Sequence, residues 1–249
     1  MNEHYISLIA AYGTGVLLWY LANYVFKSIW KDHKTITFEK PWLEFIFSIM
    51  AVIAIIGIGQ LYLRDLMLPN DGNKVIDAIN QFLIFSPTLL LIAIRKQPIV
   101  TIWLPKSKFL FRLVIGLVIT ICSLLVYWLI RTNAPSFESL LTNTYHPKNI
   151  SYLVQVFMED ITIALIFVRL SAWIGNKRTI AIVAILFAAG HIPSLLTSGF
   201  AVNELGSLFL DAFIVVLVLS AVSKSRDVWW FFILHFTLDM SQFYGGLLP

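Results

Sequence analysis

Charged residues are scarce in this chain. Lys, Arg, Asp and Glu make up 13% of the 249 residues, hydrophobic residues make up 59%, and the mean hydropathy is +0.82. Soluble domains carry about 25% charged residues, so this composition excludes an ordinary soluble protein and predicts an all-α, polytopic membrane protein. Cysteine is nearly absent as well. Cys122 is the only one, which excludes an intramolecular disulfide and any metal site built on several cysteines.

The N-terminus lacks the basic residues of a secretory signal peptide. It begins Met1-Asn2-Glu3-His4, and the apolar run that follows continues past Tyr20. We therefore expect the first segment to remain as a helix. The net charge of +4 comes from basic residues in short loops beside the apolar runs, so we expect contact with membrane lipids and no nucleic-acid partner.

Long apolar runs, in contrast, are abundant. Runs of about 20 residues bounded by charges or turn residues predict eight membrane-spanning helices. They lie near 5–26, 42–63, 75–94, 109–130, 151–172, 179–197, 204–223 and 227–247. These helices leave no room for a separate soluble domain. We predict one integral-membrane domain over 1–249, with spans one to four in 1–150 and the motif-bearing spans five to eight in 151–249.

Basic residues alternate between the connections of these spans. Those in the odd-numbered loops are Lys27, Lys31, Lys34, Lys40, Arg95, Lys96, Lys106, Lys108, Lys177, Arg178, Lys224 and Arg226, and those in the even-numbered loops are Arg64, Lys74, Arg131 and Lys148. Cytoplasmic loops of membrane proteins carry the excess of Lys and Arg. The pattern therefore predicts that both termini lie outside, in the cell membrane if the source is prokaryotic.

Ionisable residues interrupt the last four spans. They are Glu159, Asp160, His191, Asp211, His235 and Asp239. Such residues are costly at bilayer depth and usually mark a pathway or a reaction centre. With a rise of about 1.5 Å per residue, the acids and His191 on four different spans fall at one depth in the outer half of the bilayer. His235 and Asp239 share a helix face at i, i+4. We predict a polar site among spans five to eight.

These residues form three ordered motifs: Glu159-Asp160, then Phe187-Ala188-Ala189-Gly190-His191, then His235-Phe236-Thr237-Leu238-Asp239. The set resembles the CAAX protease and bacteriocin-processing family, also called the Abi family of intramembrane peptidases, over roughly 151–242. The family motifs are E-E-x-x-x-R, F-x-x-x-H and H-x-x-x-N or -D. The first motif departs from this pattern twice, because its second Glu is Asp160 and the expected Arg is Ala164.

The resemblance implies hydrolysis of a peptide bond in or near the bilayer, in a small peptide or a lipid-modified or membrane substrate. Carried over by position, Glu159 and His191 activate water, and His235 with Asp239 polarises the carbonyl group. A carboxylate paired with an imidazole is a general-base arrangement, and a fixed donor stabilises the developing oxyanion. We expect Asp239 to orient His235, and Asp160 belongs to the same catalytic set. Asp211 matches no motif, and we expect it to have a structural role or to support the catalytic residues without acting on the substrate.

Other interpretations remain open from sequence alone. Glu159, His191 and His235 could hold a divalent metal such as zinc. The sequence lacks H-E-x-x-H, however, and we expect a mechanism without a cofactor. Without the motif Arg, the chain could be an inactive relative that binds a membrane-protein partner. Intramembrane acids and histidines also serve proton-coupled transporters. We expect the aromatic run from Trp229 to Phe232 to form an interfacial, lipid-facing belt.

Overall fold

The fold was obtained as a computed structural model, which describes residues 3–30, 36–69, 71–131, 134–190 and 205–244. Within these ranges the chain is all-α and contains no strand, as the composition predicts. The long helices are α1 (Glu3–Val25), α3 (Pro41–Leu63), α4 (Lys74–Ile94), α5 (Phe109–Ile130), α7 (Ile150–Ile174), α8 (Asn176–Gly190), α10 (Leu205–Ser225) and α11 (Val228–Tyr244). They correspond one to one with the eight predicted spans.

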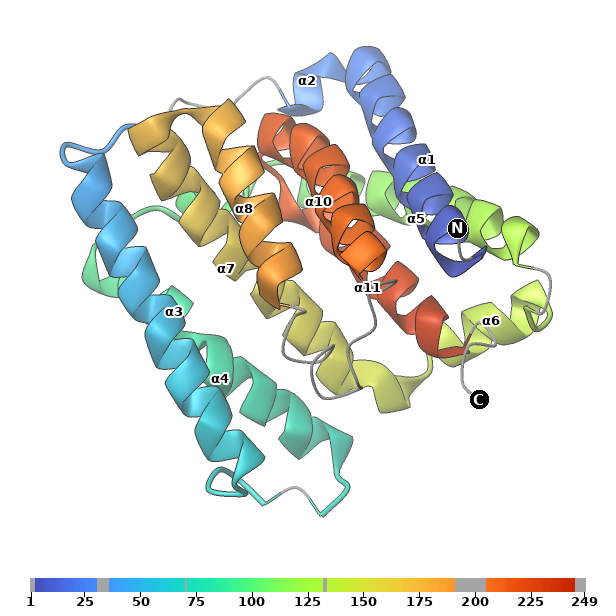
Figure 1. Ribbon diagram of the computed structural model, residues 1–249, viewed down its shortest axis with the longest axis horizontal. Coiled ribbons are helices and arrows are strands. Elements are labelled where there is room, and N and C mark those ends of the chain that lie inside the picture. The colour runs from blue at the N-terminus through green and yellow to red at the C-terminus, as the bar shows by residue number, and fades with distance from the viewer. Residues whose placement is uncertain (1–2, 31–35, 70, 132–133, 191–204, 245–249) are drawn as a thin grey trace.

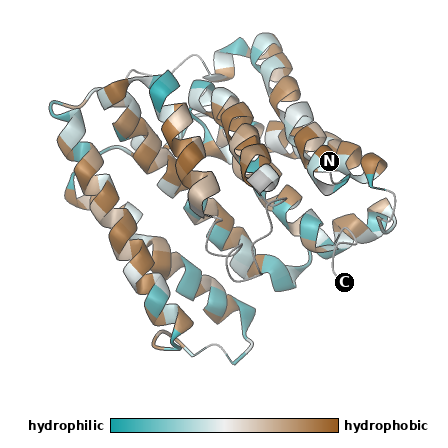
Figure 2. Cartoon of the chain, in the orientation of Figure 1, coloured by the Kyte–Doolittle hydropathy of each residue, from teal (hydrophilic) through white to brown (hydrophobic). Residues whose placement is uncertain are grey.

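Five of these helices are long and apolar enough to cross a membrane: Tyr5–Val25, Pro41–Leu63, Lys74–Ile94, Phe109–Ile130 and Leu208–Ser225. The hydropathy colouring shows the brown surfaces that they present (Figure 2). The three helices that carry the polar motifs, α7, α8 and α11, lie among them (Figure 1). The chain is therefore an integral membrane protein, and the helices that carry the polar motifs pack against its apolar spans.

Helix α7 is the centre of the bundle, since it contacts α3, α4, α8 and α11. Helix α11 packs between α7 and α5, and α1 packs against α5 and α10. Helices from both halves of the sequence thus enclose α7 and α11. Close contact between α5 and α11 depends on Gly116, because a Cβ there would lie 2.6 Å from Cα of Trp230. Small residues allow membrane helices to approach each other in this way.

The connections that are rich in Lys and Arg meet at one end of the bundle. Nζ of Lys108 donates to the carbonyl oxygen of Ser28 at 2.9 Å, which joins the first basic loop to the second. Asp227, in the turn between α10 and α11, accepts from Trp30 Nε1 at 3.2 Å and pairs with the buried Arg112 at 2.5 Å. These contacts agree with the predicted alternation of the loops.

The aromatic run at the start of α11 corrects one prediction. Trp230 is fully buried and stacks on Trp19 of α1, with ring centroids 5.8 Å apart. Trp229 donates from Nε1 to the carbonyl oxygen of Pro105 and stacks on Phe157 of α7. The run is not a lipid-facing belt, because α11 lies inside the bundle and has neighbours on several sides.

The connection between α5 and α7 is partly helical. It contains α6 (Phe137–Thr144) and a 3-10 turn (Pro147–Asn149). The side chain of Ser136 caps α6 by accepting from the backbone N–H of Ser139, and Leu140 is fully buried. A capped turn with one apolar face has the features that stabilise a short helix against a bundle. Two further short elements, α2 (Lys27–Trp30) and a 3-10 turn (Ile99–Ile102), lie in the basic loops.

Candidate active site

Helix α7 carries the first motif on its most enclosed stretch. Met158, Asp160, Ile161 and Ala164 are all buried, with Asp160 only 3% exposed, whereas Glu159 is half-buried. Neighbouring residues on a helix point about 100° apart. The two acids of the motif therefore have different surroundings, and they can have different roles in a reaction.

His235 on α11 joins the third motif to the first. Its Nδ1 lies 2.9 Å from Oδ1 of Asp160, and its Nε2 lies 3.4 Å from Oδ2 of Asp239 on the next turn of α11. One imidazole therefore lies between two carboxylates, one of which is buried and the other partly exposed. The ring of Phe231 stacks on the imidazole with centroids 5.4 Å apart, which restricts its rotation further.

Glu159 is held by its own helix. Nε2 of Gln155, one turn earlier, donates to Oε1 of Glu159 at 2.8 Å. Glu159 also interacts electrostatically with His235 and with Asp239, so the half-buried carboxylate belongs to the same cluster. The second carboxylate oxygen of Glu159 has no hydrogen bond within the described residues, and a carboxylate oxygen of this kind can accept a proton from water.

The cluster unites four of the six residues that the sequence singled out: Glu159, Asp160, His235 and Asp239. His191 lies outside the described residues, as does Pro193. Asp211 lies in the second turn of α10 and is half-buried. Helix α10 packs against α8 and α1.

The missing arginine of the first motif leaves Asp160 with a different partner, an imidazole. Ala164, at the motif position, is fully buried and offers no charge. Asp160 instead pairs with the imidazole of His235. Arg169 does not take over this task, because its guanidinium donates to the carbonyl oxygen of Leu165 and to Oε1 of Gln97, away from the motif.

Two residues near the cluster were missed from the sequence. Gln155 could have been found from its i, i+4 spacing to Glu159, which is the spacing at which helical side chains meet. Tyr12 on α1 is 6% exposed and interacts electrostatically with Asp239 and Asp160. No local pattern points to Tyr12, because it comes from a helix about 150 residues away in the chain. Helix α1 approaches α11 closely at Gly15, where a Cβ atom would lie 2.6 Å from the side chain of Leu234.

Comparison with known protein families identifies this segment. Residues 149–241 match the family model described as type II CAAX prenyl endopeptidase Rce1-like. The resemblance to CAAX proteases is confirmed over these residues. Neither the curated proteins nor the solved structures gave a match. The Rce1-like segment begins at the start of α7, ends near the end of α11 and includes all three motifs.

In the described ranges no group of three His, Cys, Asp or Glu side chains is arranged to hold a metal ion. The metal set that the sequence suggested, Glu159, His191 and His235, includes His191, which lies outside these ranges. Both ring nitrogens of His235 face carboxylates.

Proposed function

We propose that this protein is an intramembrane peptidase that hydrolyses a peptide bond in a small, lipid-modified or membrane-bound peptide by means of activated water. The observation that supports this most directly is the contact between His235 and Asp160 beside Glu159. It joins the first and third motifs of a CAAX endopeptidase-like segment across two helices. If the side chains of these motifs had pointed away from one another, they could not have formed one active site.

Asp160 and Asp239 orient the imidazole of His235. Nδ1 of the ring lies 2.9 Å from Oδ1 of Asp160, and a proton on Nδ1 in this contact fixes the plane of the ring. Nε2 then faces Asp239 and the partly exposed side of the cluster. In the doubly protonated ring, Nε2 also carries a proton and donates it to a substrate carbonyl oxygen placed there, which stabilises the oxyanion of the tetrahedral intermediate.

Glu159 is the proposed base. Gln155 holds one of its oxygens, and the other is available to accept a proton from water as the water attacks the carbonyl carbon. The proton then passes to the leaving amine, which restores the carboxylate. His191, by its place in the second motif, is proposed to assist Glu159 in orienting the water.

The substrate class follows from the surroundings of the site. The matching family is named for prenyl-protein cleavage, so a prenylated peptide is the first substrate to test. The charge pattern, however, puts the polar level in the outer half of the bilayer under the positive-inside rule. We therefore propose that a secreted peptide or a membrane-protein segment fits better than a cytosolic prenylated tail.

The experiment is a cleavage assay on the purified chain in detergent, with quenched fluorescent peptides that do or do not carry a farnesyl group. We expect Glu159→Gln and His235→Ala to lower the turnover number on the order of 100-fold or more, because each removes a group that acts in the transition state. Glu138→Gln is the matched control, since Glu138 is exposed on α6. Full activity in both site variants would refute the proposal.

A second candidate function is supported by Ala164. Without the motif arginine, the chain could bind a peptide or a membrane-protein partner and leave it intact. In that case the wild-type chain and Glu159→Gln would retain a fluorescent peptide equally, as measured by anisotropy, and neither would cleave it. Cleavage by the wild type, lost in Glu159→Gln, excludes this alternative.

A further inference from the structure

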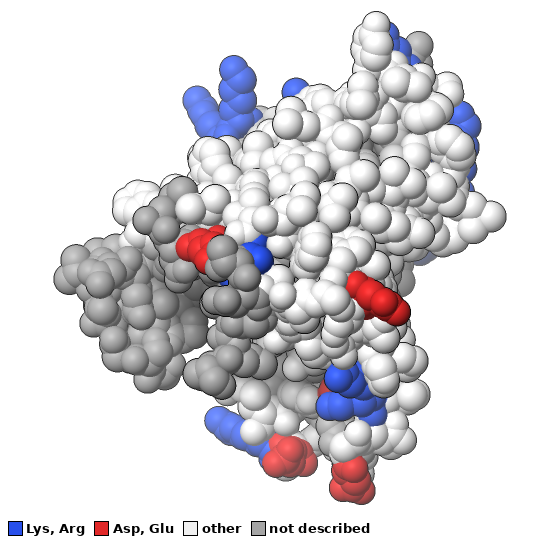
Figure 3. All heavy atoms as spheres, turned by 90° about the vertical axis from the view of Figure 1, so that its right-hand side faces the viewer, with Lys and Arg blue, Asp and Glu red and all other residues white. Residues whose placement is uncertain are grey.

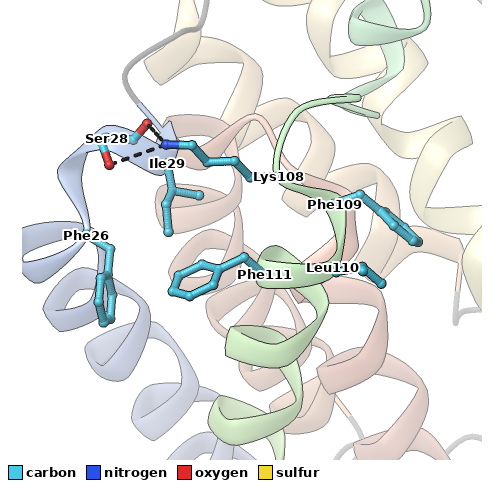
Figure 4. A pocket seen from close by; sticks show the side chains of 7 residues that line it. All are labelled: Phe26, Ser28, Ile29, Lys108, Phe109, Leu110 and Phe111. Atoms are coloured by element: carbon cyan, nitrogen blue, oxygen red, sulfur yellow. Dashed lines mark hydrogen bonds between the residues drawn. The ribbon is translucent and has the colours of Figure 1, made fainter.

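A groove lies at the basic end of the bundle, far along the sequence from the polar cluster. It has a volume of about 590 Å³ and is formed by the end of α1, by α2 and by the start of α5. Figure 4 shows Phe26 and Phe111 side by side, with Ile29 and Lys108 above them. The rings of Phe26 and Phe111 are 5.5 Å apart in an edge-to-face contact. The lining is therefore almost entirely apolar, with one cation at its rim.

The cation at the rim has no acidic partner in the described part of the chain. Nζ of Lys108 donates to the carbonyl oxygen of Ser28 at 2.9 Å and approaches its hydroxyl at 3.4 Å. Both acceptors are neutral, so they fix the position of the ammonium group without neutralising its charge. A hydroxyl and an ammonium side by side offer donors to a phosphate group.

The groove lies at the level where lipid headgroups are expected. Helix α1 ends at Val25 and α5 begins at Phe109, so the apolar spans stop at the rim. Leu110 is 73% exposed and Phe26 is 42% exposed on the outer surface beside it. Figure 3 shows Lys and Arg along the upper rim of the adjoining face, above a broad uncharged band. Exposed apolar side chains below a row of cations are typical of a surface that meets lipid.

We propose that this groove binds one anionic phospholipid, with the phosphate at Lys108 and Ser28 and one acyl chain along Phe26, Ile29 and Phe111. The apolar lining matches an acyl chain, and the ammonium group matches a negative headgroup. A zwitterionic lipid fits the same lining and gains less from Lys108. The bound lipid lies against α2 and the start of α5, and α5 in turn packs against the helix that carries His235.

The test is native mass spectrometry of the purified full chain, titrated with phosphatidylglycerol or phosphatidylcholine. We expect a preference for phosphatidylglycerol, and Lys108→Gln should weaken its retention about fivefold without changing that of phosphatidylcholine. Ser28→Asp, which places an acid against Nζ of Lys108, should weaken it at least as much. Lys96→Gln is the control, because Lys96 is exposed in the same basic loop and does not line the groove.

Three results would overturn the proposal. Equal retention of both lipids by the wild type would mean that the groove holds unselected lipid. Unchanged phosphatidylglycerol binding in both Lys108→Gln and Ser28→Asp would show that the phosphate lies elsewhere. Competition by inorganic phosphate at the concentration at which phosphatidylglycerol binds would identify an ion site. Loss in both variants, with Lys96→Gln unchanged, supports the lipid site whatever the activity of the chain.

Discussion

Asp160 is the residue at which the sequence and the family pattern diverge most. It replaces a glutamate, and its expected arginine partner is Ala164. The shorter acid is buried, and its partner is the imidazole of His235 on another helix. Its second oxygen, Oδ2, has no hydrogen-bond partner in the described part of the chain. Such a buried carboxylate depends on one contact for its compensation.

Asp160→Asn tests this dependence. The amide has nearly the same shape and can accept from Nδ1 of His235, but it lacks the charge that holds the ring. We expect the turnover number to fall on the order of 100-fold while the chain stays folded. The measurement is the peptide-cleavage rate, with Asp65→Asn as the control because Asp65 is exposed. Unchanged turnover in Asp160→Asn would show that His235 does not need this partner.

Gln155→Ala is the corresponding test for Glu159. Removing the donor to Oε1 leaves the carboxylate free to rotate, so the base is positioned less often for attack. We expect a roughly 10-fold loss of turnover, which is smaller than for Glu159→Gln because the base itself remains. A Gln155→Glu variant should lose more, since a second acid one turn away repels Glu159. Equal turnover in all three chains would exclude a positioning role for Gln155.

At the scale of helices, the site depends on how closely α11 is held between α5 and α7. Gly116 allows the backbone of α5 to lie against that of Trp230, and Trp230 in turn stacks on Trp19. The sequence showed an apolar span with aromatic residues at its start. It did not show which face of α11 is inward, because this helix is apolar on most of its circumference.

Gly116→Ala should therefore destabilise the bundle. The added methyl group would lie 2.6 Å from Cα and 3.0 Å from the carbonyl oxygen of Trp230, and backbone cannot rotate away as a side chain can. We expect a loss of about 1–3 kcal/mol of stability. The measurement is the transition temperature at which Cys122, the only thiol, becomes accessible to a thiol-reactive dye in detergent.

Gly13→Ala is the control for this variant. No atom lies within 4 Å of the position that its Cβ would take, and alanine favours a helix over glycine. The transition temperature of Gly13→Ala should therefore stay the same or rise. Equal transition temperatures for Gly116→Ala and the wild type would mean that α5 and α11 are farther apart than the structure indicates.

At the scale of the whole molecule, the basic loops define one end and the polar cluster lies toward the other. The pair of Arg112 and Asp227 holds α5 to the turn before α11, and the contact of Lys108 with Ser28 adds the first loop. The orientation of this bundle in the membrane remains a prediction from the charge pattern, which places the basic end inside.

Cysteine labelling tests the orientation. In a Cys122→Ser background, Lys96→Cys and Lys177→Cys should react only with reagents that enter the cell. Asn143→Cys, on α6 at the opposite end, should react with an impermeant maleimide from outside. Protection of Asn143→Cys together with outside labelling of Lys96→Cys would reverse the orientation and bring the cluster into the inner half of the bilayer.

The sequence by itself determined the features that depend on composition and on local spacing. The apolar runs predicted all eight long helices, and α5 begins and ends where expected. The pairs at i, i+4, such as His235 with Asp239, follow from helix geometry alone. The three ordered motifs also located the segment that matches the CAAX endopeptidase family.

Only the tertiary structure decided which groups from different helices meet. Asp239 was expected to orient His235, yet Asp160 makes the shorter contact from a helix 75 positions earlier in the chain. Trp230 is inside the bundle, and Tyr12 reaches the cluster from α1. In an apolar helix that is hydrophobic on every side, the sequence does not distinguish the lipid-facing side from the packed side. The packing of neighbouring helices makes that choice, and it brings the acids and the imidazole together.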